Sequence, residues 1–187
     1  QDFTPTDELR LGTWSVSGSA LTIQAWANFD DFNQDDPRII SKAIEGDVQD
    51  HVFMLSLSGE GERYPRMRIK TGTSDTSGTA TLIASSGALT AEMWHMITGK
   101  YDGSTMRLYT DGVQAGSMSK TGALRENSWE TWAGNNPNNT DVASWGAMDG
   151  KLDEIRVSSV ARSADWLAAQ YKSQSNSFNT FGAEQTQ

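Results

Sequence analysis

An acidic side chain within an apolar stretch is the first candidate for chemistry in this sequence. Residues 151–158 (KLDEIRVS) read as a β-strand in which Asp153 shares a face with Ile155 and Val157, while Glu154 and Arg156 face the other way. An unpaired carboxylate on an apolar face costs several kcal/mol, so Asp153 needs a partner. A calcium ion is one candidate, because it takes roughly six to eight oxygen ligands. The alternative is that Asp153 lies at the mouth of the strand and caps backbone N–H groups.

A second candidate site combines tryptophan with an amide-rich loop. The chain has seven Trp residues, and residues 135–141 read NNPNNTD. Flat aromatic faces can stack on the C–H faces of sugars, and a few polar groups beside aromatic surface are typical of a ligand site. We therefore predict a glycan-binding site made of Trp129, Trp145, Asn135, Asn136, Asn138, Asn139 and Asp141.

Core packing is the competing interpretation for the tryptophans, because large aromatic side chains dominate sandwich cores. On that basis we expect Trp26, Trp94 and Trp132 in the core and Trp166 docking a C-terminal helix. Trp129 and Trp145 fit either interpretation.

Two further polar patterns are weaker. The pattern D-x-N-x-D, which opens an EF-hand loop, occurs at Asp31, Asn33 and Asp35. Asp36 stands where the motif requires Gly, so an ordinary solvated loop is favoured. The strand at residues 66–71 places Arg66, Arg68 and Lys70 on one face. That face could bind an anionic polysaccharide such as a uronate, although a solvated outer sheet face explains it equally simply.

Catalytic patterns find little support. Retaining glycosidases need two carboxylates about 5 Å apart, and Asp153 and Glu154 are adjacent, so they face opposite sides of a strand. His51 and His95 are the only histidines, and neither belongs to a zinc pair or a Ser-His-Asp set.

The elements that must position these residues are short strands. Leu21–Phe29 alternates cleanly, with Leu21, Ile23, Ala25, Ala27 and Phe29 on one face. Residues 94–118 form three strand-like runs joined at Asp102-Gly103 and Asp111-Gly112, and Asp-Gly pairs are typical of tight hairpin turns with positive φ. Further strands are expected at residues 38–42, 51–57, 66–71, 81–85, 128–133 and 151–158.

One helix is expected near the C-terminal end. Ser163 is a suitable N-cap, Asp165 follows in the first turn, and WLAAQY supplies helix formers. Together these patterns predict an all-β fold: a two-sheet antiparallel jelly-roll sandwich with one short C-terminal helix. We assign residues 1–172 to this domain and residues 173–187, with Phe178 and Phe181, to a last edge strand and a polar tail or linker.

Composition excludes several function classes. The chain has no Cys, which excludes disulfides and thiolate metal sites. Its formal charge is −9, so it repels phosphate backbones and anionic lipid surfaces, and we expect neither nucleic acid nor membrane partners. An acidic surface suits neutral ligands, divalent cations or solubility.

Four segments in order resemble one known superfamily. They are SALTIQAWANF at residues 19–29, RIISKA at 38–43, MWHMITGKYDGSTMRLYTDGV at 93–113 and GKLDEIRVSSVARSADW at 150–166. The chain is similar to the laminin-G-like, concanavalin A-like lectin/glucanase jelly-roll superfamily, in the version common in secreted multidomain bacterial proteins. The resemblance implies a structural cation near the strand of Asp153, with ligands from the N-terminal loop, where Asp7 is the candidate. The first strand of the family is shortened or divergent here, at residues 1–5.

Three functions follow from the resemblance and the missing catalytic set, since one fold hosts many activities. The first is a non-catalytic carbohydrate-binding module, extracellular or at the cell surface, within a larger glycan-degrading or adhesive protein. Its partners would be a polysaccharide or glycan and the neighbouring domains of a longer polypeptide. The alternatives are an adhesion or scaffold domain that binds protein, and a glycanase or polysaccharide lyase.

Overall fold

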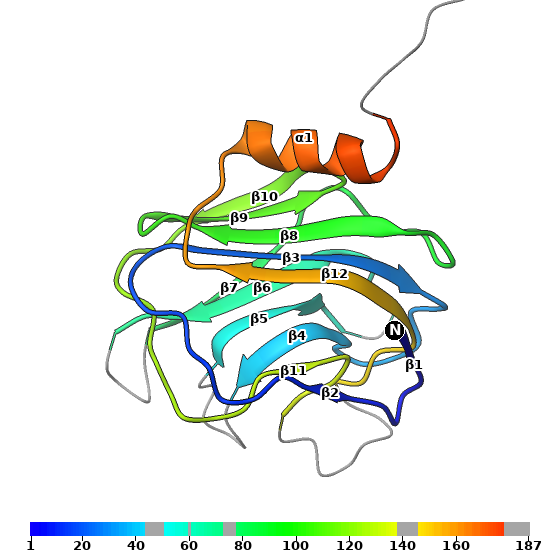
Figure 1. Ribbon diagram of the computed structural model, residues 1–187, viewed down its shortest axis with the longest axis horizontal. Helices are drawn as coiled ribbons and strands as arrows, with labels where there is room; N and C mark the ends of the chain where they lie inside the picture. Colours follow the sequence, from blue (N-terminus) through cyan, green and yellow to red (C-terminus); the bar gives the residue numbers. More distant parts are fainter. Residues whose placement is uncertain (44–50, 60, 73–77, 138–145, 178–187) are drawn as a thin grey trace, which may run out of the picture.

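The protein consists of two antiparallel sheets packed face to face, with one helix outside them (Figure 1). The structure, a computed structural model, describes residues 1–43, 51–59, 61–72, 78–137 and 146–177. Each sheet has six strands, which confirms the predicted jelly-roll sandwich. Within the described residues no helix is long and apolar enough to cross a membrane.

The first sheet, here called sheet A, has the order β1-β12-β3-β8-β9-β10. These strands are β1 (Asp2–Phe3), β12 (Gly150–Ser158), β3 (Leu21–Phe29), β8 (His95–Tyr101), β9 (Thr105–Thr110) and β10 (Val113–Ser119). Sheet B has the order β2-β11-β4-β5-β6-β7. Its strands are β2 (Leu9–Arg10), β11 (Trp132–Ala133), β4 (Arg38–Ala43), β5 (His51–Leu57), β6 (Pro65–Lys70) and β7 (Thr79–Ile83).

Alternation along β3 builds the centre of the core. Leu21, Ile23, Ala25, Ala27 and Phe29 are all buried and belong to one hydrophobic cluster, as predicted. The opposite face of β3 is also covered, because Thr22 and Gln24 are only 3% and 2% exposed. The helix and the segment that leads into it account for this second layer of burial, which the alternation alone does not predict.

The two Asp-Gly turns of the meander differ. Asp111 and Gly112 have φ values of 54° and 77° and form the two-residue turn between β9 and β10, as predicted. At the other turn only Gly103 has a positive φ, and the Asp102 carboxylate instead accepts hydrogen bonds from the backbone N–H groups of Ser104 and Thr105. This side-chain turn replaces the expected primed turn and needs an aspartate at its start.

Helix α1 (Ala164–Gln174) begins as predicted. The Ser163 side chain caps it by accepting a 3.1 Å hydrogen bond from the Trp166 backbone N–H. Leu167 is the helix residue that is fully buried, and the rest of the helix lies over the outer face of sheet A (Figure 1). The helix crosses the Asp111-Gly112 turn so closely that a Cβ on Gly112 would lie 3.0 Å from the Ala168 Cα.

The tryptophans are distributed differently from the expectation. Trp132 is buried, as predicted, but Trp94 is 43% exposed. Trp26 lies on the outer face of β3, where its ring stacks on Tyr171 of α1 at 5.7 Å and its Nε1–H donates to Gln174. Trp166, which was expected to dock the helix, is 39% exposed. The core is therefore mainly aliphatic, and two of its expected tryptophans are used elsewhere.

Candidate functional site

The groove between helix α1 and strand β12 is the candidate functional site, and we call it the helix groove. It consists of two cavities that share Arg156 and Trp166. The first has a volume of about 610 Å³ and is lined by Thr22, Gln24, Ile155, Arg156, Val157, Ser158, Arg162 and Trp166. The second has a volume of about 470 Å³ and is lined by Arg156, Trp166, Ala169, Gln170, Ser173 and Gln174.

Trp166, in the first turn of α1, lines both cavities. The Arg162 guanidinium lies over its ring, 4.7 Å from the ring centroid. Thr22 holds the backbone of Arg162 in place through two hydrogen bonds. Its hydroxyl accepts one from the Arg162 backbone N–H at 3.0 Å and donates one to the Val160 carbonyl at 2.6 Å. The indole is thus exposed but held in place on a rigid strand and a capped helix.

Polar groups line the rest of the helix groove. Gln24, which is 2% exposed, lines the first cavity and donates its side-chain N–H to the Met96 sulfur. In the second cavity the side-chain oxygen of Gln170 is buried and accepts no hydrogen bond from the described residues. A buried acceptor without a donor costs free energy, so this amide oxygen is not stabilised by its surroundings.

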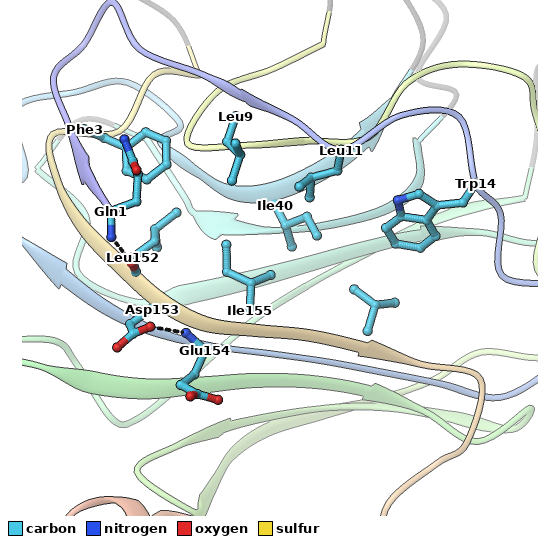
Figure 2. A pocket seen from close by; sticks show the side chains of 11 residues that line it. Gln1, Phe3, Leu9, Leu11, Trp14, Ile40, Leu152, Asp153, Glu154 and Ile155 are labelled. Atoms are coloured by element: carbon cyan, nitrogen blue, oxygen red, sulfur yellow. Dashed lines mark hydrogen bonds between the residues drawn. The ribbon is translucent and has the colours of Figure 1, made fainter.

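A second, chemically different groove opens along the free edge of the sandwich, between β12 and β2 (Figure 2), and we call it the edge groove. Its volume is about 570 Å³ and its walls are mainly apolar. Figure 2 shows Ile155 directed toward Ile40, Leu152 near Gln1, and Trp14 at one end of the groove. Trp14 is 36% exposed and its ring stacks on Phe53 at 5.7 Å. Such a surface suits an apolar occupant better than a sugar.

Strand β12 has a bulge that overturns the predicted facing of Asp153. Its pairing with β3 shifts between Asp153 and Arg156, and Glu154 has a φ of 53°. As a result Asp153 and Glu154 are both exposed at the rim of the edge groove, with their carboxylates directed away from Ile40 (Figure 2). The Asp153 carboxylate accepts a hydrogen bond from the Glu154 backbone N–H at 2.8 Å. It therefore caps a backbone N–H group, which was the alternative to calcium binding.

The residues proposed for calcium are each engaged locally. Asp7 accepts hydrogen bonds from the backbone N–H and the hydroxyl of Thr4, and the first of these lowers the pKa of its carboxyl most. In the part of the chain that the structure describes, no group of three or more Asp, Glu or His side chains could hold a metal ion. Calcium binding by Asp7 and Asp153 therefore stays a prediction.

The expected EF-hand opening is an ordinary loop. Asp31 accepts hydrogen bonds from the backbone and side-chain N–H groups of Asn33, which uses both of its carboxylate oxygens. This local turn agrees with the solvated loop that the sequence favoured.

The predicted glycan-binding set is only partly within the described residues. Asn135 and Asn136 are buried, at 0% and 5% exposure. Trp129 is partly buried, and its backbone carbonyl accepts a hydrogen bond from the Lys42 ammonium. Asn138, Asn139, Asp141 and Trp145 lie outside the described residues. The described ends of this loop meet beside Arg38, because the Gly146 carbonyl accepts the Arg38 backbone N–H at 3.0 Å.

The cations expected on a solvated face are instead buried. Arg66 and Lys70 are 8% and 1% exposed, which overturns that expectation. Arg66 and Arg38 both form ion pairs with Asp36, and the distance from the Arg38 guanidinium to the Asp36 carboxylate is 2.8 Å. Burial, with a smaller contribution from the neighbouring positive charge of Arg68, lowers the pKa of Arg38 to about 9 and that of Arg66 to about 10. This buried ion-pair network holds the outer face of sheet B together at the base of the 135–146 loop.

The geometry above agrees with comparisons to known families. A family model of the concanavalin A-like lectin/glucanases superfamily matches residues 3–168. This chain belongs to that superfamily. No curated protein matches it.

Solved structures of the superfamily's fold are similar over most of the chain. The native heptameric SAP-like pentraxin from Limulus polyphemus has a TM-score of 0.64 at 15% identity, over 91% of this chain and 80% of that one. The CBM40 of Ruminococcus gnavus IT-sialidase, bound to α2,3 sialyllactose, has a TM-score of 0.61 at 13% identity, over 87% and 98%. Domain 4 of AbnA, an extracellular GH43 arabinanase from Geobacillus stearothermophilus, in complex with arabinotriose, has a TM-score of 0.55 at 14% identity, over 86% and 70%. At these identities the likeness establishes the fold alone.

Sequence reasoning missed the helix groove. It treated Trp166 as a docking residue and did not use Arg156 or Arg162. One signal was available: α1 places Trp166 four residues before Gln170, so both side chains share a helix face with Ser173 and Gln174. An aromatic and amide face next to the final strand is a candidate for binding.

Proposed function

We propose that this chain is a non-catalytic carbohydrate-binding module, secreted as part of a larger glycan-degrading or adhesive protein, and that the helix groove binds the glycan. The observation that carries the proposal is the pairing of an exposed indole, Trp166, with the amide side chains of Gln170 and Gln174 in one groove. A sugar offers a partner to both, a C–H face for the indole and hydroxyl groups for the amides.

The groove's composition favours binding over catalysis. Among the described residues no Asp or Glu lines either cavity, and glycoside hydrolysis ordinarily needs two carboxylates beside the bond that breaks. The solved neighbours that are named for carbohydrate ligands share this fold, which supports a glycan partner and an extracellular location for this chain.

The test is glycan binding by wild-type protein and two tryptophan variants. Affinity electrophoresis and isothermal titration calorimetry across soluble polysaccharides should identify a ligand, and Trp166→Ala should weaken its binding about tenfold or more, or roughly 1.4 kcal/mol. Trp94→Ala is the matched control, since Trp94 is similarly exposed but lines neither cavity. Equal binding by both variants, or no retardation of the wild type on any polysaccharide, would reject the proposal.

The edge groove favours a second candidate function, an adhesion or scaffold domain that binds protein. Leu9 and Trp14 are large apolar residues at this groove and are 41% and 36% exposed. Its occupant would be an apolar polypeptide segment, bound by side-chain contacts because the bulge between Asp153 and Arg156 makes β12 irregular where it lines the groove. Self-association or partner capture in sedimentation velocity that Trp14→Ser abolishes would support this function over the first.

A further inference from the structure

The charge of the helix groove is opposite to that of the protein. The chain carries 24 Asp and Glu residues and a net charge of −9, yet the charged side chains that line the two cavities are Arg156 and Arg162. In a strongly acidic protein, a groove whose described charged lining residues are both cations concentrates positive potential at one place. This local field favours an anionic group on the ligand, although the overall composition suits neutral ligands.

Arg162 is positioned to provide that interaction. Its side chain forms no ion pair with any carboxylate of the described residues, and its guanidinium is fixed over the Trp166 ring. A guanidinium stacked on an indole keeps its N–H edges free for a planar acceptor, and a carboxylate is the acceptor that matches their spacing. Lysine offers the charge without this fork geometry.

Arg156 is the second cation and connects the two cavities. It pairs with Glu154, and both side chains are almost half exposed, so solvent and salt weaken the pair. A ligand carboxylate in the groove could therefore share Arg156 with Glu154 at little cost. The β12 bulge turns Glu154 outward beside Arg156, which keeps the groove itself without an acid.

We infer that the helix groove selects carboxylate-bearing sugars, meaning uronic or sialic acids, with the carboxylate on Arg162 and Arg156 and the sugar ring near Trp166. This inference rests on the proposed function and adds the class of ligand. Gln170 and Gln174 then provide the amides for hydroxyl groups in the second cavity.

The experiment compares ligands that differ only in the carboxylate. Polygalacturonate is compared with the same polymer after complete methyl esterification, and sialyllactose with lactose, by titration calorimetry at low salt and again at 0.5 M NaCl. We expect at least one acidic ligand to bind ten times or more tightly than its neutral counterpart, and the pair that responds identifies a uronate or a sialate. Arg162→Gln should remove most of this preference, while Arg162→Lys should retain part of it.

Controls separate specific recognition from general charge effects. Lys172→Gln removes one positive charge from the same helix outside both cavities and should leave binding unchanged. Equal affinity for esterified and free polymer, with binding still lost in Trp166→Ala, would overturn the acidic-sugar inference and leave the proposed function intact. Acidic binding that Arg162→Gln and Lys172→Gln weaken equally would overturn it as well. No binding to any acidic or neutral glycan would instead reject the proposed function itself.

Discussion

Helix α1 is attached to the sandwich by few contacts, and Leu167→Ala should test how much the helix groove depends on them. Leu167 is the fully buried residue of the helix, with 0% exposure. Replacing a buried Leu by Ala costs about 2–5 kcal/mol, depending on how far the site can collapse. This free energy is lost from the contact between α1 and the surface of sheet A. We therefore expect local opening of α1 rather than unfolding of the sheets.

The remaining contacts of α1 are too weak to compensate. The Trp26–Tyr171 ring stack contributes about 0.5–1.5 kcal/mol beyond area burial. The 2.9 Å hydrogen bond from Trp26 to Gln174 adds about 0.5–1.5 kcal/mol. A detached helix of this length is marginal in water, because isolated helices shorter than about 12–15 residues rarely form. Detachment therefore removes one wall of the helix groove.

Hydrogen exchange followed by mass spectrometry measures this opening directly. A loss of about 2 kcal/mol lowers the protection of amides in α1 roughly 30-fold, while amides of β3 and β8 should keep wild-type protection. Glycan affinity should fall with the fraction of molecules that keep α1 docked. Leu167→Met conserves volume and should cost less than about 1.5 kcal/mol. Unchanged protection in α1, or an equal loss throughout both sheets, would refute the reasoning.

Two further predictions concern stability. Asp102→Ala should destabilise the protein by about 1–3 kcal/mol, because it removes the acceptor for Ser104, Thr105 and Arg107. Partial burial alone would raise the pKa of Asp102, but these hydrogen bonds outweigh it and hold the pKa well below its usual range. The carboxylate therefore stabilises the fold above about pH 4, and this contribution is lost as pH falls through the depressed pKa. Urea unfolding at pH 7 and at pH 2 should show the difference between wild type and variant shrinking in acid; a constant difference would contradict the assignment. The calcium prediction is checked by thermal melting with and without EDTA: a bound ion should make the melting temperature fall by several degrees with chelator, and Asp153→Ala should abolish that response. An identical melt in both conditions would reject the metal.

Sequence patterns predicted the elements better than the site, for physical reasons. The alternation of β3 sets its buried face, because a strand between two others has little freedom in how it presents side chains. The N-cap at Ser163 is equally local, so the start of α1 could be predicted to the residue. The facing of Asp153 could not, since one extra residue in β12 breaks the parity and nothing in the local sequence marks the bulge.

The helix groove depends on contacts between distant segments. Its walls come from β3, β12 and α1, and only the fold places Gln24 beside Arg162 and Trp166. The position of Trp26 likewise depends on a distant segment, because its ring stacks on Tyr171, far along the chain. Composition alone assigns such a ring to the core. Aromatic content predicted that sugar-binding surface was available, but which ring remains exposed was decided by tertiary packing.

Ile155 and Val157 of β12 line both grooves, so a single strand is the partition between them. A ligand on one side of this partition restrains the same backbone that the other side uses. Thermodynamic linkage then requires that any effect of a polypeptide in the edge groove on glycan affinity be matched by an equal effect of the glycan on the polypeptide. If both grooves bind their proposed occupants, β12 is the shared element through which the two binding events would affect each other.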